Sequence, residues 1–186
     1  MLSAEHANEF VAIVERGRRS APLAYSSIHG EQHWQSVARI GSRLAADTAA
    51  ADLRLVLLFA ALHDACRENE DHDPDHGRRA GYLIDQLRAS GELSLDRDEL
   101  ARLRGAVARH NDGEISRDPT IGVCWDADRL CLPRVGIEPR DELLSTLAGR
   151  RHREWARGTL SEPMVDWREL LRSHEQRSTG SGSPRR

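Results

Sequence analysis

The sequence predicts a single-domain, all-α helical bundle of about 7–8 helices, and three observations indicate this fold class. The chain has 186 residues, a common size for one domain. Long segments rich in Ala, Leu and Arg carry apolar residues at helical spacing. Alternating β-branched runs are few. We expect residues 1–177 to form the domain and 178–186, STGSGSPRR, to be a disordered tail with nothing to bury.

Helices are expected over residues 3–19, 30–48, 52–66, 74–90, 96–110, 120–132, 139–149 and 162–176. Asp73 before Pro74 is typical of an N-cap followed by proline at the first helical position, Gly91 follows a helix end, and Asp118 before Pro119 marks the next start. Apolar stripes at helical spacing support the second to sixth helices. In chain order they are His33, Val37, Ile40, Leu44; Val56, Phe59, Ala60, His63; His76, Ala80, Leu83, Ile84, Leu87; Leu100, Leu103, Val107, His110; and Cys124, Ala127, Asp128, Cys131.

Composition narrows the possible partners. All 27 basic residues are Arg, against 30 acidic residues, so the formal net charge is −3 and predicts no nucleic-acid polymer as a partner. The longest apolar run, Leu55 to Leu62, is too short to span a bilayer. The start of the chain lacks a secretory signal pattern and its three cysteines are an odd number, so we expect a cytoplasmic protein with reduced thiols and a small-molecule partner.

Each of the five stripes turns one ionisable side chain into the core, and Asp64 directly follows His63 of the second stripe. A single inward His is usually a hydrogen-bonded core residue. Burying several unpaired imidazoles and carboxylates costs several kcal/mol each, so this set must either line a cleft or share a strong partner. A divalent cation is the natural partner, and imidazole with carboxylate suits Mn, Fe, Co, Ni or Zn. The set is His33, His63, Asp64, His76, His110 and Asp128.

Three segments resemble the HD superfamily of metal-dependent phosphohydrolases, in family order and separation. They are HGEQHWQSVARIG, LFAALHDACRENEDHDPDHGRRAG and DADRLCLPRVGIEP, which together carry an H…HD…D signature between about Ser27 and Ala148. The resemblance implies an all-helical HD-type domain. It also implies that His33, His63, Asp64 and Asp128 hold one ion, with His76 and His110 supporting a second and Asp64 bridging the two. For His76 and His110 a packing role is the alternative.

The resemblance implies hydrolysis of a small phosphorylated substrate, a phosphomonoester or a nucleotide, with Asp64 orienting or deprotonating an attacking water. Three subfamilies are disfavoured because their sequence patterns are absent. They are the deoxynucleotidase-like members (HDxPE), the alarmone hydrolases (HDxxED) and the cyclic-dinucleotide phosphodiesterases (HHExxDGxGYP). Arg67 stands at the Glu position of the HDxPE pattern. Two alternatives remain: an HD-fold diiron oxygenase, and a non-catalytic sensor that binds a nucleotide or metal. The sequence does not set the oligomeric state.

Three residues are candidates for substrate contact. His29 lies one turn before His33, and would either line the pocket or cap the helix start. Arg67 follows Asp64 by three residues and would clamp a phosphate if the helix continues, or would pair with a nearby acid. Arg134, in LPRVGI, is a candidate phosphate contact. Of the two acids in WDADRL we expect Asp128 to face the site and Asp126 to face solvent, because residues two apart on a helix point about 200° apart.

Overall fold

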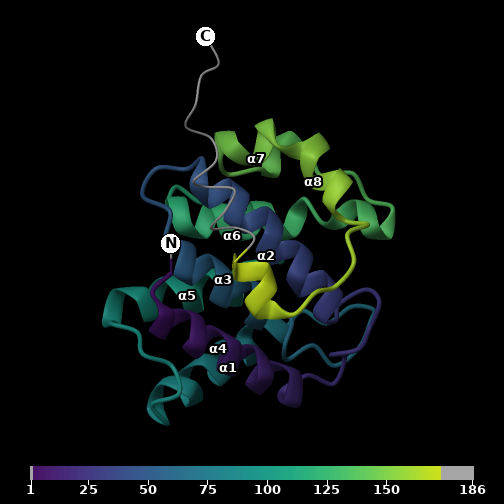
Figure 1. Cartoon of the computed structure of the whole chain (residues 1–186). Helices are drawn as coiled ribbons and strands as arrows, with labels where there is room; N and C mark the ends of the chain where they lie inside the picture. The colour runs from purple at the N-terminus through teal and green to yellow at the C-terminus, as the bar shows by residue number, and fades with distance from the viewer. Residues whose placement is uncertain (1, 173–186) are drawn as a thin grey trace.

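The computed structural model describes residues 2–172, and this part of the chain contains helices and no strands, which confirms the all-α class (Figure 1). The predicted tail at 178–186 lies outside the described residues. A last helical segment covers residues 167–172. The preceding elements are α1 (Ala4–Ser20), α2 (Glu31–Ala46), α3 (Leu53–Leu62), α4 (His76–Ala89), α5 (Arg97–Arg109), α6 (Pro119–Arg129), the 3₁₀ turns η1 (Leu132–Val135) and η2 (Asp141–Leu143), α7 (Leu147–Arg151) and α8 (Arg153–Thr159).

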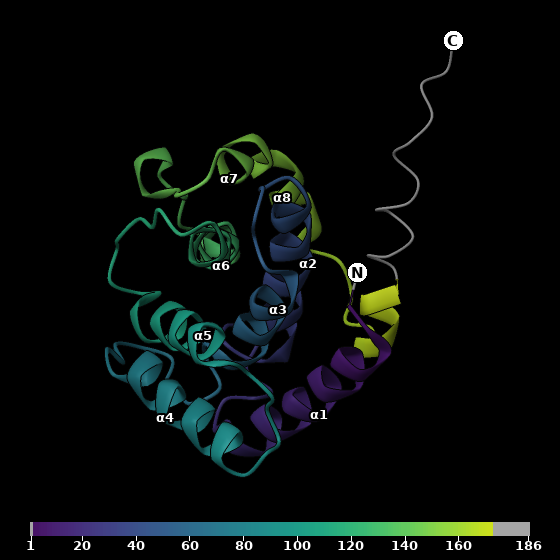
Figure 2. The same ribbon diagram turned by 90° about the vertical axis from the view of Figure 1, so that its left-hand side faces the viewer.

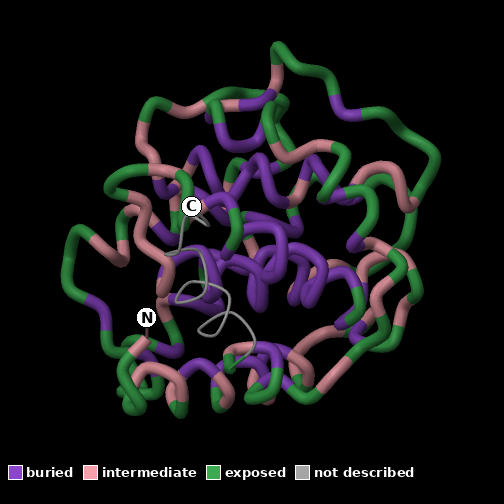
Figure 3. Tube along the Cα trace, turned by 45° about the horizontal axis from the view of Figure 1, so that its top comes forward, coloured by how far each residue is buried: buried purple, intermediate pink, exposed green. Residues whose placement is uncertain are grey.

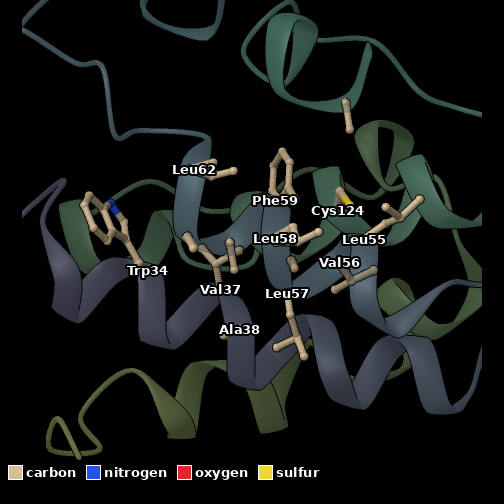
Figure 4. Close-up of a cluster of buried hydrophobic side chains, with 14 of the residues drawn as sticks. Trp34, Val37, Ala38, Leu55, Val56, Leu57, Leu58, Phe59, Leu62 and Cys124 are labelled. Atoms are coloured by element: carbon tan, nitrogen blue, oxygen red, sulfur yellow. The ribbon is translucent and has the colours of Figure 1, made fainter. Parts of the chain in front are cut away.

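Helix α3 is the centre of the core. Every residue from Leu55 to Leu62 is buried, and the Asp52 carboxylate caps the helix by accepting hydrogen bonds from the amides of Arg54 and Leu55 at 2.9 and 3.2 Å. Helices α1, α2, α5 and α6 surround α3 (Figure 2). Figure 4 shows Trp34 and Val37 of α2 beside the leucines of α3. This packing fixes α3 from all sides, so the residues that end it have a fixed position.

The outer elements close the bundle at two ends. Helices α4 and α5 pack on each other at one end, and α7 and α8 cover α6 and α2 at the other (Figure 2). The segment at 167–172 lies against α1, with the rings of Trp167 and Phe10 edge to face at 5.4 Å. Buried segments gather in the interior and exposed ones at the periphery (Figure 3). Among the described residues, no helix has both the length and the apolar character needed to cross a bilayer.

Several predicted boundaries were wrong, and the structure gives the reasons. The expected helix at 139–149 is instead η2 followed by α7, because the chain at Leu144 is extended and presents the Ser145 and Thr146 amides to Asp126. Helix α8 was not predicted. Helix α4 begins at His76, since the Asp73 carboxylate bonds Arg79 and the Glu68 amide instead of capping a helix. The predictions that Asp118 caps a helix and that Gly91 follows a helix end are confirmed, and Gly91 has a left-handed backbone.

Candidate metal centre

The six predicted ligands come together, each from an end of a helix. His33 lies in the first turn of α2 and His76 is the first residue of α4. His63 and His110 are the C-caps of α3 and α5, and Asp128 lies in the last turn of α6. All but Asp128 are buried, and 19% of the Asp128 side chain is exposed. Asp128 is therefore the member of the cluster that solvent reaches best.

The six side chains form two groups that share Asp64. In the first group the His33 and His63 Nε2 atoms are 3.1 Å apart, and Asp128 Oδ1 lies 3.2 and 3.7 Å from them. Asp64 Oδ2 lies 3.7 and 3.6 Å from the same two nitrogens. In the second group the His76 and His110 Nε2 atoms are 2.9 Å apart, and Asp64 Oδ1 lies 3.2 and 3.7 Å from them. One Asp64 oxygen thus faces each histidine pair.

The end of α3 places Asp64 between the two groups. We expected this helix to continue to residue 66, but it ends at Leu62. The His63 Nδ1 atom lies 3.2 Å from the Ala60 carbonyl oxygen, which the Asp64 amide would bond in a continued helix. The chain then tightens, with the Ala65 amide donating to the Leu62 carbonyl at 3.1 Å. The Asp64 carboxylate consequently points into the bundle.

Two glycines allow the close approaches that the cluster needs. A Cβ atom on Gly77 would lie 2.5 Å from the Val107 carbonyl oxygen, so only glycine lets the start of α4 approach α5 closely enough to pair His76 with His110. A Cβ atom on Gly30 would lie 2.4 Å from the Ser26 oxygen. Gly30 is also the N-cap of α2, directly before the turn that carries His33.

Hydrogen bonds orient three of the histidines so that their Nε2 atoms face the interior of the cluster. The Nδ1–H groups of His63, His76 and His110 donate to backbone carbonyls of Phe59 or Ala60, of Asp73 and of Val107. In the neutral form of each ring, Nε2 then carries a lone pair that faces the other rings and the carboxylate oxygens. Acceptors at these distances repel one another unless a positive charge lies among them. The donor set of imidazole nitrogens and carboxylate oxygens fits a divalent transition metal.

The pKa shifts of His33, His63 and the two carboxyls agree with this arrangement of charge. Burial lowers the pKa of His63 to about 3, and burial together with nearby Arg134 lowers the pKa of His33. Burial also acts to lower the pKa of His110, but its hydrogen bond to Asp64 and the nearby Asp128 carboxylate outweigh burial and raise it. Burial alone raises the pKa values of the Asp64 and Asp128 carboxyls, but the surrounding histidines outweigh it and hold both below the ordinary range. Ionised carboxylates and neutral imidazoles are the protonation states in which these side chains ligate metals. The Nδ1 atom of His33 is buried and has no hydrogen-bond partner within residues 2–172.

His29 faces the cluster and does not cap α2, because Gly30 occupies that position. Its Nδ1 atom lies 3.2 Å from Asp64 Oδ2, and its Nε2 atom lies 3.7 Å from Glu70 Oε2. Glu70 in turn accepts a hydrogen bond from the Ser26 hydroxyl. Sequence reasoning missed the position of Glu70 beside His29, and no spacing signal reveals it, since the contact joins two loops 41 positions apart (Glu70 minus His29).

The two candidate arginines differ in the contacts that their guanidinium nitrogens already make. The helix that would have placed Arg67 beside Asp64 does not continue. The Arg67 Nε and Nη2 groups donate to the loop carbonyls of Asn69 and Asp71, and Nη1 lies 3.3 Å from His76 Nδ1, at the start of α4. Arg134 donates from Nε to the Ile28 carbonyl and from Nη1 to the Cys131 carbonyl. Its Nη2 group makes no hydrogen bond among the described residues. Arg134 is therefore the better placed of the two to meet an anion.

The prediction that Asp126 faces solvent was wrong. Its side chain is fully buried and accepts hydrogen bonds from the Ser145 amide at 2.6 Å and from the amide and hydroxyl of Thr146 at 2.8 and 2.7 Å. Burial raises the pKa of the Asp126 carboxyl, and these three donors oppose that shift. The two acids do point apart, but the face opposite Asp128 is covered by the chain that leads into α7.

Comparison of the chain with protein-family models, with curated proteins and with solved structures finds no match. The cluster is therefore interpreted from its own geometry and donor chemistry.

Proposed function

We propose that the protein is a metal-dependent phosphohydrolase with a dinuclear centre. The observation that carries the proposal is the position of Asp64, whose two oxygens each face one histidine pair. This is the arrangement of a carboxylate that bridges two ions. His33, His63 and Asp128 would hold the first ion and His76 and His110 the second, with Asp64 common to both. The resemblance to the HD superfamily favours the same assignment.

A bound divalent pair would lower the pKa of a water molecule and offset negative charge on phosphate oxygens. The Asp64 carboxylate would accept a hydrogen bond from the attacking water and so orient it. His29, 3.2 Å from Asp64 Oδ2, would hold that carboxylate in place. The substrate, a phosphomonoester or a nucleotide, would approach from the side of Asp128, the most exposed member of the cluster, and the Nη2 group of Arg134 would contact its phosphate.

Phosphate release from a panel of phosphate esters and nucleotides tests the proposal. Protein purified without added metal is assayed before and after supply of Mn, Fe, Co, Ni or Zn. Asp128→Asn should reduce turnover by at least about 100-fold, because even residues outside the ligand shell cost 10–100-fold. The control His72→Ala changes an exposed histidine outside the cluster and should leave turnover unchanged.

Two results would contradict the proposal. Iron-loaded protein that consumes O2 with an organic substrate and hydrolyses no ester would indicate a diiron oxygenase. Tight nucleotide binding without any turnover by the metal-loaded protein would indicate a sensor.

A further inference from the structure

A cavity of about 630 Å³ lies at the end of the bundle covered by α7 and α8. Its lining includes the C-cap of α6, Pro133 of the η1 turn, residues 138 and 139, and five residues of α7 and α8. None of the lining residues belongs to the His/Asp cluster. A cavity of 300–1,000 Å³ is the usual size for a small-molecule site.

The cavity is lined by four arginines and two glutamates, Arg150, Arg151, Arg153, Arg157, Glu138 and Glu154, and so carries excess positive charge. Arg150 donates to the backbone carbonyls of Leu144 and Thr146. Arg153 donates to the Pro139 carbonyl and pairs with the Asp141 carboxylate, so its charge is already partly balanced. These bonds reduce the entropy that the two side chains would lose on binding an anion.

The other two arginines are available to a ligand. Arg151 is exposed and makes no hydrogen bond among the described residues. Arg157 pairs with Glu138 through Nη2, but both side chains are more than half exposed, at 56% and 64%. Exposed ion pairs contribute little to stability, so an anion can replace Glu138 at modest cost.

We propose that this cavity binds a phosphorylated small molecule of nucleotide size. Its phosphates would lie on Arg151 and Arg157, because planar guanidinium groups bind phosphate oxygens in pairs. Its apolar part would lie against Leu130, Pro133 and Pro139, the apolar residues among the lining. The inference does not depend on the chemistry proposed for the metal centre.

Calorimetric titration with ADP, at a low and constant salt concentration, tests this inference. Wild-type protein should bind ADP saturably and should bind adenosine far more weakly. Arg151→Ala combined with Arg157→Ala should weaken ADP binding about tenfold or more, because two charge-assisted contacts are lost. Glu138→Gln should strengthen binding a few-fold, because it releases Arg157 and removes a negative charge.

The matched control is Arg104→Ala, which changes an exposed arginine of α5 that also pairs with an exposed acid, Asp85. It should change ADP affinity by less than about twofold, as expected for an exposed charge beyond the screening length. Absence of saturable binding, equal binding of adenosine, or equal weakening by Arg104→Ala would overturn the inference. Loss of ADP binding in Asp128→Asn would also overturn it, because ADP would then belong to the metal centre.

Discussion

The substitution Asp126→Asn should unfold the protein more easily without removing its metal. The Asp126 carboxylate accepts three hydrogen bonds, one at Oδ1 and two at Oδ2, from the segment that leads into α7. An amide offers only one acceptor oxygen. If that oxygen takes the Oδ2 position, the amide NH2 faces the Ser145 amide, and two donors then meet in a buried space.

The free-energy cost of Asp126→Asn comes from the Ser145 amide, which loses its hydrogen-bond acceptor. A buried donor left unsatisfied costs about 1–3 kcal/mol, out of about 5–15 kcal/mol for a whole domain. In urea, a loss of about 2 kcal/mol lowers the unfolding midpoint by about 1 M when the slope is near 2 kcal/mol/M. Urea unfolding followed by circular dichroism measures this shift, and elemental analysis measures metal retention in the same preparation.

Asp128→Asn is the matched control, because it makes the same chemical change two residues along α6. It should lose metal while the backbone contacts of α6 persist, since the Asp128 carboxylate faces His33 and not the α7 segment. An Asp126→Asn protein as stable as the wild type would refute the anchoring role. An Asp126→Asn protein that is stable but metal-free would show that α6 is rotated differently from the structure.

Three further results are expected. Chelation should lower the melting temperature, because metal bound only by the folded state adds to its stability; an unchanged melting curve after verified metal loss would show that the cluster is satisfied without a cation. His76→Ala or His110→Ala should lower the metal content from about two ions per chain towards one; unchanged stoichiometry would assign both histidines to packing. Burial raises the pKa of Asp73, but the Glu68 amide and Arg79 outweigh burial and hold it below its ordinary value. Asp73 therefore stabilises the fold above pH of about 4 and loses this effect as pH falls through its folded pKa; Asp73→Asn should flatten the acid side of the stability profile, and an unchanged profile would contradict this.

Local patterns were sufficient to predict the helices that surround the core and the convergence of the six ligands. The stripe that ends in His63 is apolar along its whole length, and Asp118 before Pro119 is a helix start that needs no tertiary contact. Each inward His was visible because it continues an apolar stripe. The meeting of His76 with His110 follows from that rule and from the space that Gly77 leaves.

Tertiary contacts decided the features that the sequence did not reveal. The sequence predicts that Asp126 faces solvent because nothing in its own helix shows that Ser145 and Thr146 lie over it. The helix at 139–149 was predicted because residue composition there does not reveal that the same two amides must turn towards Asp126. The prediction that Arg67 lies beside Asp64 was wrong because it required α3 to continue. Helix α3 ends at Leu62, where the His63 side chain contacts the Ala60 carbonyl.

The central claim is that the buried His/Asp cluster is a two-ion metal centre. Elemental analysis of the protein purified without added metal, beside Asp64→Ala and the exposed control His72→Ala, tests it most directly. The account predicts about two transition-metal ions per chain in the wild type and in His72→Ala, and almost none in Asp64→Ala, which removes the shared ligand. A wild-type protein that takes up no metal even when supplied with it, or equal metal content in all three proteins, would contradict the account.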